Sequence, residues 1–414
     1  MVSVTGPSGA RAVARCDTLG VPPYSDTADG LYRAYLTPAY RAAQEAVAGW
    51  MAEAGMTVHC DPAANLVGRY EGVDPAAPIL LIGSHLDSVR NAGRYDGPLG
   101  IMLGIEAVAE LHRQGRRLPF AVEVIAFGDE EGSRFPAAML TSRAVAGTLD
   151  RAALDIADAD GVTLAAAGVD VADYLEAARP PGSVRAYFEA HIEQGPVLEA
   201  EGLAVGTVTG IAAQLRYRVI VDGMAGHAGT TVMNLRRDAL AGAAEMICAV
   251  ENLARRDQSD LVATVGSVEV GPGAANVVPG SASFTLDIRS GKASRRDRVA
   301  TAILECCDDI ARHRGLGIAR ELLHDLPASP CDVRLMNLLD ESVAAEDLPV
   351  RRLVSGAGHD AMVMAALAPT AMLFLRCAGG VSHNPAERVD PADADMALRV
   401  ITRFMEKMAD DAAA

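Results

Sequence analysis

The segment IGSHLDSVRNAGRYDGPLG, residues 82–100, places a histidine and two aspartates directly after a run of apolar residues. An unpaired polar side chain beside an apolar core costs several kcal/mol of folding free energy. His85, Asp87 and Asp96 therefore predict a bound ligand at the end of a buried strand. Because His85 and Asp87 are two residues apart in a strand-like segment, their side chains point the same way. We expect the Asp87 carboxylate to accept the second ring N–H of a metal-bound His85.

Further acidic residues and histidines follow other apolar runs. Glu130 and Glu131 adjoin each other at the end of the strand-like AVEVIAFGDEEG. Their side chains diverge, so one can bind a metal while the other acts as a general base. His191 in EAHIEQGP and His383 in GGVSHNPAE also come after predicted strands. Three histidines together with carboxylates suit two divalent ions bridged by a carboxylate.

Each of these motifs has a simpler interpretation when it stands alone. SHLD can cap or line a core, DEE can form a solvated turn, and the later histidines can belong to the core or to a loop. Their occurrence together, each at the end of an apolar run, favours a metal site over unrelated structural roles. No role is assigned to four other histidines, which fall in polar stretches: His59, His112, His313 and His324.

The elements that must position these side chains alternate between strands and helices. Helical apolar spacing over residues 37–55 precedes the strand-like NLVGRY and PILLIGSH, which are followed by helical LGIMLGIEAVAELHRQG and strand-like AVEVIAFG. This alternation predicts an α/β fold with a mostly parallel, helix-covered sheet. Ligand sites in such sheets lie beyond the carboxyl ends of the strands, which is where SHLD and GDEEG fall.

From about residue 212 the pattern changes to β-α-β-β-α, with the alternating apolar and polar residues of an antiparallel sheet. We interpret residues 212–327 as a separate α+β domain that is inserted into the first domain. The catalytic domain is then expected to comprise residues 1–211 and 328–414. In this interpretation the buried strand APTAMLFLRC returns the chain to the first sheet.

The composition argues against several classes of partner. The 414 residues are 50% hydrophobic and carry a net charge of −17, which suits a globular protein and disfavours nucleic acid or an anionic membrane surface as partner. No apolar run reaches the roughly 18 residues of a membrane span, and the N-terminus lacks a signal-peptide pattern. We therefore expect a cytoplasmic protein. Seven cysteines without CxxC spacing indicate reduced thiols.

Together, these residues carry a resemblance to a known family. The segments GSHLDSV, GRYDGPLG, FGDEEGSRF, HIEQGPVLE, GHAGTT, LDIRS, SGAGHDA and SHNPAE resemble the amidase, hydantoinase/carbamoylase family of the dinuclear metallopeptidase and aminoacylase superfamily. The resemblance implies two metal ions bridged by Asp96, with Glu130 as the general base. The implied ligands are His85, Asp96 and His191 for one ion, and Asp96, Glu131 and His383 for the other.

The resemblance also implies that the inserted domain is a lid and a dimerisation domain. His227 of GHAGTT would polarise the scissile carbonyl, and it would reach the metal site of the partner chain in a homodimer. Val232 stands where the family commonly has proline, a change that adjusts a loop but removes no reactive group. The residues implied to bind substrate, the last two of them as a clamp for its carboxylate, are Gln194, Gln214, His227, Asn276 and Arg289.

The implied activity is metal-dependent hydrolysis of a ureido C–N bond in a small substrate that carries a carboxylate. The stretch HAGTTVMNLRRDAL and the N-terminal region resemble the branch of the family that acts on allantoate. This resemblance implies conversion of allantoate to ureidoglycine, ammonia and CO2 in purine and allantoin nitrogen catabolism. One alternative is an N-carbamoyl-L-amino acid amidohydrolase. Others are a dipeptidase or aminoacylase, which His191 disfavours, and a binding protein without activity, which the complete set of ligands disfavours. These ligands suit manganese, zinc or cobalt, and the resemblance favours manganese.

Overall fold

The computed structural model of the chain describes residues 6–413 and divides into two compact units. Unit 1 comprises the described residues up to Thr209, Cys331–Leu353 and the chain from Ala357 onward, whereas unit 2 comprises Gly210–Pro330 and Val354–Gly356. Unit 2 begins two residues before the expected insertion and ends three residues after it, and it also includes the short segment 354–356. Residues 1–5 and 414 of the expected catalytic domain lie outside the described part of the chain.

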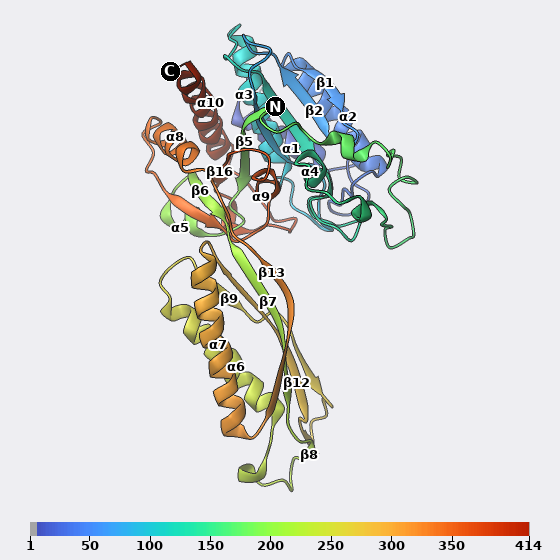
Figure 1. Cartoon of the computed structure of the whole chain (residues 1–414), viewed down its shortest axis with the longest axis vertical. Coiled ribbons are helices and arrows are strands. Elements are labelled where there is room, and N and C mark those ends of the chain that lie inside the picture. Colours follow the sequence, from blue (N-terminus) through green and yellow to red (C-terminus); the bar gives the residue numbers. More distant parts are fainter. Residues whose placement is uncertain (1–5, 414) are drawn as a thin grey trace. The chain divides into compact units, whose positions relative to one another are not determined.

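Unit 1 is built around a mixed sheet (Figure 1). Every residue of β3, β4 and β16 is buried, as expected for strands that are covered on both faces. The four central strands are mutually parallel and run in the order β4 (Val122–Phe127), β3 (Ile79–His85), β5 (Val184–Ile192) and β16 (Thr370–Leu375). Strands with antiparallel pairing flank them. At one side β2 (Leu66–Tyr70) pairs with β4 and β1 (Thr57–Cys60) pairs with β2, and at the other side β6 (Val205–Ile211) pairs with β16.

Helices cover both faces of this sheet. Because successive side chains of a strand point to opposite faces, Phe188 of β5 packs on Phe404 of α10 (Pro391–Ala413), with ring centroids 5.1 Å apart. Its neighbour Glu189 points the other way and accepts a hydrogen bond of 2.9 Å from the Ala361 N–H of α9 (Asp360–Met364). The expected α/β class is therefore confirmed. The other α-helices of this unit are α1 (Gly9–Leu19), α2 (Pro38–Glu53), α3 (Pro98–Arg113), α4 (Leu140–Val145), α5 (Val197–Glu201) and α8 (Val333–Ala344).

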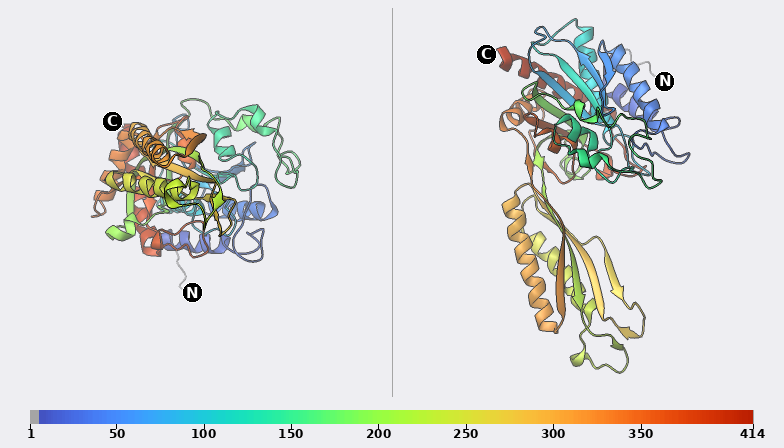
Figure 2. Two further views of the ribbon diagram at one scale, coloured as in Figure 1. Left: turned by 90° about the horizontal axis from the view of Figure 1, so that it is seen from below. Right: turned by 45° about the vertical axis from the view of Figure 1, so that its right-hand side comes forward.

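Unit 2 is an antiparallel sheet with its two α-helices packed on one face (Figures 1 and 2). Its strands run in the order β10-β12-β7-β13, and β9 also pairs with β12. In β12 the buried residues Phe284, Leu286 and Ile288 contribute to the core with the helices, so Asp287 and Arg289 lie on the opposite face. The elements are β7 (Ala213–Asp222), α6 (Ala239–Arg256), β9 (Val262–Thr264), β10 (Val268–Gly271), β12 (Ser281–Ser290), α7 (Ala293–Arg314) and β13 (Gly317–Leu326).

Three shorter features complete the chain trace. In unit 2, β8 (Gly226–His227) and β11 (Val277–Val278) form a two-stranded ribbon. Two short strands, β14 (Ser329–Pro330) and β15 (Arg352–Ser355), both pair with β6. Between residues 6 and 413, no helix combines the length and apolar character needed to cross a membrane.

Candidate metal centre

The predicted metal ligands of unit 1 lie at the carboxyl ends of its parallel strands. His85 is the last residue of β3, and His191 is the residue before the last of β5. Glu130 and Glu131 follow β4, and His383 follows β16. Because the carboxyl ends of parallel strands meet at one edge of a sheet, the fold brings together residues that are far apart in the sequence.

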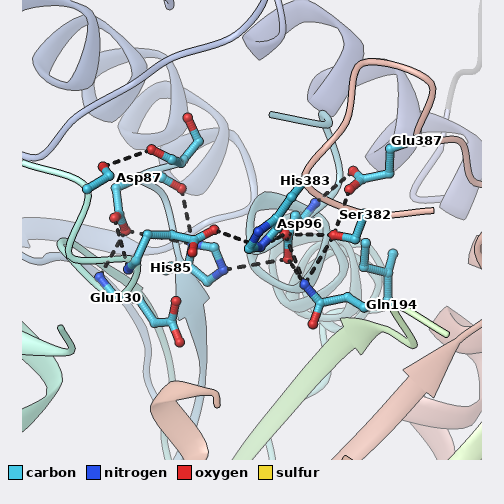
Figure 3. Close-up of polar contacts among 12 residues, drawn as sticks. His85, Asp87, Asp96, Glu130, Gln194, Ser382, His383 and Glu387 are labelled. Carbon is cyan, nitrogen blue, oxygen red and sulfur yellow. Dashed lines mark hydrogen bonds and ion pairs between the residues drawn. The ribbon is translucent and has the colours of Figure 1, made fainter. Parts of the chain in front are cut away.

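Asp96 is shared between two groups of potential ligands (Figure 3). In the first group, its Oδ1 lies 3.2 Å from His191 Nε2 and 3.9 Å from His85 Nε2. In the second group, its Oδ2 lies 3.2 Å from His383 Nε2, which in turn is 3.4 Å from Glu131 Oε1. The ligand atoms of each group lie within 4.8 Å of one another. A carboxylate with one oxygen in each group has the arrangement that bridges two cations.

The histidine rings are oriented for metal binding. His85 Nδ1 lies 3.1 Å from the Asp87 carbonyl oxygen, and His191 Nδ1 lies 2.9 Å from that of Ile192. A ring that donates its Nδ1–H to a carbonyl presents the lone pair of Nε2 to the metal. Among the described residues the buried His191 Nε2 makes no well-aligned hydrogen bond, although Asp96 Oδ1 lies 3.2 Å away. Burial lowers the pKa of His85 to about 4, which keeps this ring in the neutral, metal-binding form.

The surroundings of Asp96 attract positive charge. Burial disfavours a charged imidazole, but the adjacent Asp96 carboxylate outweighs it and raises the pKa of His191 to about 9. A proton on His191 Nε2 would occupy the position that a divalent cation can fill instead. The donor set of imidazole nitrogens and carboxylate oxygens, buried in the first group and partly exposed in the second, therefore fits the two ions that the resemblance implies.

Two turns that bring the acids into the site depend on unusual backbone conformations. Gly97, which follows Asp96, has a φ of 84°, and a Cβ at this position would lie 2.5 Å from the His85 carbonyl oxygen. After β4, a Cβ on Gly128 would lie 2.4 Å from the ring of Tyr35, and Asp129 adopts a φ of 57°. A positive φ is uncommon for residues other than glycine, so the GDEEG turn is strained where it presents the two glutamates.

Asp87 contacts the site differently from the expectation. Its main-chain carbonyl, rather than its carboxylate, lies within hydrogen-bond distance of His85 Nδ1, because the carboxylate Oδ1 is 3.7 Å away. The carboxylate instead accepts hydrogen bonds from the N–H groups of Glu130, at 3.2 Å, and Glu131, at 3.3 Å. Asp87 thus connects the turn after β3 to the turn after β4. Burial raises the pKa of its carboxyl to about 7.

Glu130 is a buried acid that lies beside the first ligand group. One carboxylate oxygen of Glu130 lies within 4.8 Å of ligand atoms of His85 and Glu131. Burial, together with the negative charges of Asp360 and Glu131, raises the pKa of Glu130 well above its ordinary value. Burial and the neighbouring Asp96 likewise raise the pKa of Glu131 to about 8. Divalent cations would relieve this crowding of carboxylates.

A hydrogen-bond network holds Asp96 in place (Figure 3). Gln194 Nε2 donates to both carboxylate oxygens of Asp96, at 3.1 and 3.0 Å, and Ser382 Oγ donates to Oδ2 at 2.9 Å. Glu387 Oε1 accepts the N–H groups of Tyr95, at 2.8 Å, and Asp96, at 3.1 Å. Gln194 was expected to bind substrate, and here it contacts a ligand residue. Sequence reasoning did not single out Ser382 and Glu387, although both lie in the segment VSHNPAE.

Sequence reasoning also did not single out a second set of buried residues beside the site. Glu189, His191 and His359 form a further group with ligand atoms within 4.8 Å of one another, and the rings of His191 and His359 have centroids 4.3 Å apart. Glu189 lies two residues before His191 in β5, so strand periodicity could have placed both side chains on one face. His359 lies in SGAGHDA, a segment that contributed to the resemblance without any role being assigned to the histidine.

The remaining predicted residues belong to unit 2. Gln214 and Arg289 are cross-strand neighbours on β7 and β12, and both donate hydrogen bonds to Asp287. His227 on β8 is exposed and pairs with Val277 of β11, the residue that follows Asn276. Because the structure describes the two units separately, contact of these four side chains with the metal centre stays a prediction.

The parallel strands end in two groups of potential metal ligands that share the Asp96 carboxylate, with the buried acid Glu130 beside them. This arrangement suits a metal-dependent hydrolase. Comparison with known proteins identifies the family. The profile of the peptidase family M20/M25/M40 matches residues 81–407. The match covers more than half of the chain, so the chain belongs to this family.

Several relatives are similar to this chain over most of its length. The chain is 42% identical to an N-carbamoyl-L-amino acid amidohydrolase of Geobacillus stearothermophilus, with 92% of this chain and 94% of the relative covered. It is 41% identical to a probable allantoate deiminase of Oryza sativa subsp. japonica, with 94% of this chain and 87% of the relative covered. A crystal structure of an amidase of the hydantoinase/carbamoylase family from Burkholderia multivorans matches with a TM-score of 0.90 at 33% identity, covering 98% of both chains. The chain is thus a hydrolase acting on C–N bonds.

Proposed function

We propose that this protein hydrolyses a ureido C–N bond of allantoate to give ureidoglycine, ammonia and CO2. The observation that carries the proposal is the position of Asp96, whose two oxygens face two different ligand groups beside the buried acid Glu130. A ureido carbonyl is a poor electrophile, so its hydrolysis needs an activated water molecule and stabilisation of the developing oxyanion. The ligand set of unit 1 can hold the ions that meet this need.

The chain's own residues supply the proton transfers. When bound, the two ions lower the pKa of water and polarise the substrate carbonyl. Glu130, with its carboxylate beside the ligands, accepts a proton from the attacking water and delivers it to the leaving nitrogen. The raised pKa of Glu130, caused by burial and neighbouring acids, favours such a temporary proton holder. Glu131, which has a carboxylate oxygen within 4.8 Å of ligand atoms of Asp96 and His383, would hold the second ion.

Residues of unit 2 bind the rest of the substrate in this proposal. Arg289 has the planar fork that pairs with a carboxylate through two parallel hydrogen bonds, and Asn276 assists it. His227 donates a hydrogen bond to the carbonyl oxygen as negative charge develops there. Gln214 lies next to Arg289 and fixes the same carboxylate-binding surface.

A second candidate substrate is an N-carbamoyl-L-amino acid. The relative from Geobacillus stearothermophilus, at 42% identity, carries that name. Both substrates present one ureido group and one carboxylate, so the same ligands and the same general base serve for either. They differ in the third substituent, which is a second ureido group in allantoate and often an apolar side chain in the carbamoyl amino acid.

Ammonia release tests this proposal. The metal-loaded enzyme is assayed with allantoate and with N-carbamoyl-L-methionine, and kcat/KM is compared between the two. We expect a higher kcat/KM for allantoate, and we expect Glu130→Gln to reduce kcat by roughly 10²- to 10⁴-fold, the usual contribution of general acid–base catalysis. A clear preference for the carbamoyl amino acid would make the second candidate the substrate. Amine release from dipeptides without ammonia release from either ureido compound would overturn the proposal.

We further propose that manganese supports the activity best, with zinc and cobalt as the alternatives. Imidazole and carboxylate ligands accept all three ions, and none of the ligand groups contains a thiolate that would favour zinc. Elemental analysis after gentle purification, combined with activity after reloading with each ion, distinguishes them. Full activity of protein that contains only zinc would contradict the choice of manganese.

We also propose a homodimer formed through unit 2. In this unit β13 is an edge strand, and its apolar side chains Leu322, Leu323 and Leu326 are 53%, 39% and 39% exposed. An uncovered edge with apolar side chains favours pairing with another strand, and pairing across a twofold axis is a common arrangement.

A further inference from the structure

The outer face of the sheet in unit 2 carries a second arginine beside Arg289. Arg216 of β7 is the cross-strand partner of Asp287, just as Gln214 is the partner of Arg289. All four side chains lie on the face opposite the helices, because partners in an antiparallel pair share a face. The side chains of Arg216 and Arg289 are 37% and 29% exposed, so a ligand can reach both.

Asp287 orients both guanidinium groups. Its Oδ2 accepts hydrogen bonds from Nε and Nη2 of Arg216, at 2.8 and 2.6 Å, and its Oδ1 accepts one from Nε of Arg289, at 2.7 Å. Burial opposes a charged carboxylate here, but the hydrogen bonds from the two arginines outweigh it and lower the pKa of Asp287. Two cations around one anion leave this surface with a net positive charge.

Each arginine keeps free N–H groups for a ligand. A guanidinium has five N–H donors in a planar fork. Asp287 and the Gly356 carbonyl occupy three N–H groups of Arg289, which leaves one on Nη1 and one on Nη2. Asp287 occupies two of Arg216, and among the described residues no acceptor contacts its Nη1. Arg216 therefore presents its Nη1 and Nη2 edge, since Asp287 holds the other edge. Arg289 keeps one N–H group on each of its two terminal nitrogens.

We propose that Arg216 recognises the second ureido group of allantoate and thereby determines specificity between the two candidate substrates. This inference rests on the proposed function, in which Arg289 binds the substrate carboxylate. The free edge of Arg216 then donates to the carbonyl oxygen of the ureido group that is not hydrolysed. An N-carbamoyl amino acid with an apolar side chain offers no acceptor there and would leave the Arg216 edge unpaired. Sites built to hydrogen-bond a substrate group discriminate strongly against analogues that lack it.

Binding measurements on Glu130→Gln protein test this inference, because the substrates are consumed too slowly to disturb them. Dissociation constants of allantoate and of N-carbamoyl-L-leucine are measured by calorimetry with and without the additional change Arg216→Met. We expect the dissociation constant of allantoate to rise roughly 10- to 100-fold, the usual effect of losing a hydrogen bond to a charged group, and that of N-carbamoyl-L-leucine to change less than about 3-fold. Arg289→Lys is the matched control, and it should weaken the binding of both ligands.

The results of these measurements distinguish a failure of the Arg216 inference from a failure of the proposed function. An equal rise for both ligands with Arg216→Met would show that Arg216 only supports Asp287 and Arg289, and it would overturn the inference. No rise for either ligand would overturn it as well. If Arg216→Met protein fails to fold, Arg216→Lys replaces it, because lysine keeps the charge but lacks the planar edge. Arg216→Lys must then weaken the binding of allantoate and leave that of N-carbamoyl-L-leucine nearly unchanged. Failure of the proposed function would appear separately, as absence of ammonia release from allantoate by protein with an intact Glu130.

Discussion

Asp96 has two carboxylate oxygens, and each of them faces a different histidine at 3.2 Å. This position depends on neighbours that hold the loop from both sides. Gln194 and Ser382 donate to the carboxylate, while Glu387 accepts the main-chain N–H groups of Tyr95 and Asp96. Residues that orient a metal ligand in this way often matter for affinity nearly as much as the ligand itself.

At the scale of single residues, the first prediction concerns Glu387. Glu387→Ala removes the acceptor of two main-chain N–H groups and the partner of Ser382, so the Asp96 loop loses its fixed position. We expect the metal affinity to fall roughly 10- to 100-fold, measured by competition with a chelator. Glu406→Ala is the control, because Glu406 forms only a surface ion pair with Arg116. Equal affinities of the two variants would show that Glu387 does not position Asp96.

The sequence predicted which motifs lie together better than it predicted the contacts between their residues. The residues of SHLD, GDEEG, HIEQGP and SHNPAE lie together because each motif lies at or after the carboxyl end of one of the mutually parallel strands. The expected bond between the Asp87 carboxylate and His85 is replaced by one to the main chain, because β3 ends at His85 and side-chain alternation stops there. The contact between Glu387 and Asp96 joins residues 291 apart, and no local pattern encodes such a pairing.

At the scale of elements, the helix expected over residues 37–55 is α2 (Pro38–Glu53). Thr37 caps it by accepting a hydrogen bond from the Tyr40 N–H, and proline occupies the first turn, both of which are common at helix starts. The expected α+β insertion is also present, but no sequence pattern indicated that residues 354–356 return to unit 2. That return depends on tertiary pairing, such as the hydrogen bond between the Ala212 N–H and the Ser355 carbonyl.

The turn between β3 and α3 yields a prediction about Gly97. Gly97→Ala forces a Cβ to within 2.5 Å of the His85 carbonyl at a φ of 84°. We expect a loss of about 3 kcal/mol of unfolding free energy and a lower metal content, measured by chemical denaturation and elemental analysis. Gly115→Ala is a matched control with a φ of 64° and no atom within 4 Å of the new Cβ, and it should cost about 1 kcal/mol. Equal losses for both variants would show that the close approach at Gly97 is unimportant.

At the scale of the whole molecule, the proposed homodimer predicts that His227 serves the metal site of the partner chain. Inactive Glu130→Gln protein is mixed with inactive His227→Ala protein after dissociation. In a mixed dimer, the site with an intact Glu130 receives its histidine from the other chain. Random pairing should then restore roughly a quarter of the wild-type activity. Absence of activity in mixtures that contain mixed dimers would show that His227 acts within its own chain or not at all.

The metal content of each chain tests the central claim, a pair of ions bridged by Asp96, most directly. Purified protein is saturated with manganese, freed of excess ion and analysed for bound metal per chain. We predict two ions for the wild type and for His59→Ala, which changes an exposed histidine outside the site, about one ion for His383→Ala, and almost none for Asp96→Ala. A single ion in the saturated wild type, or two ions retained by Asp96→Ala, would contradict the account.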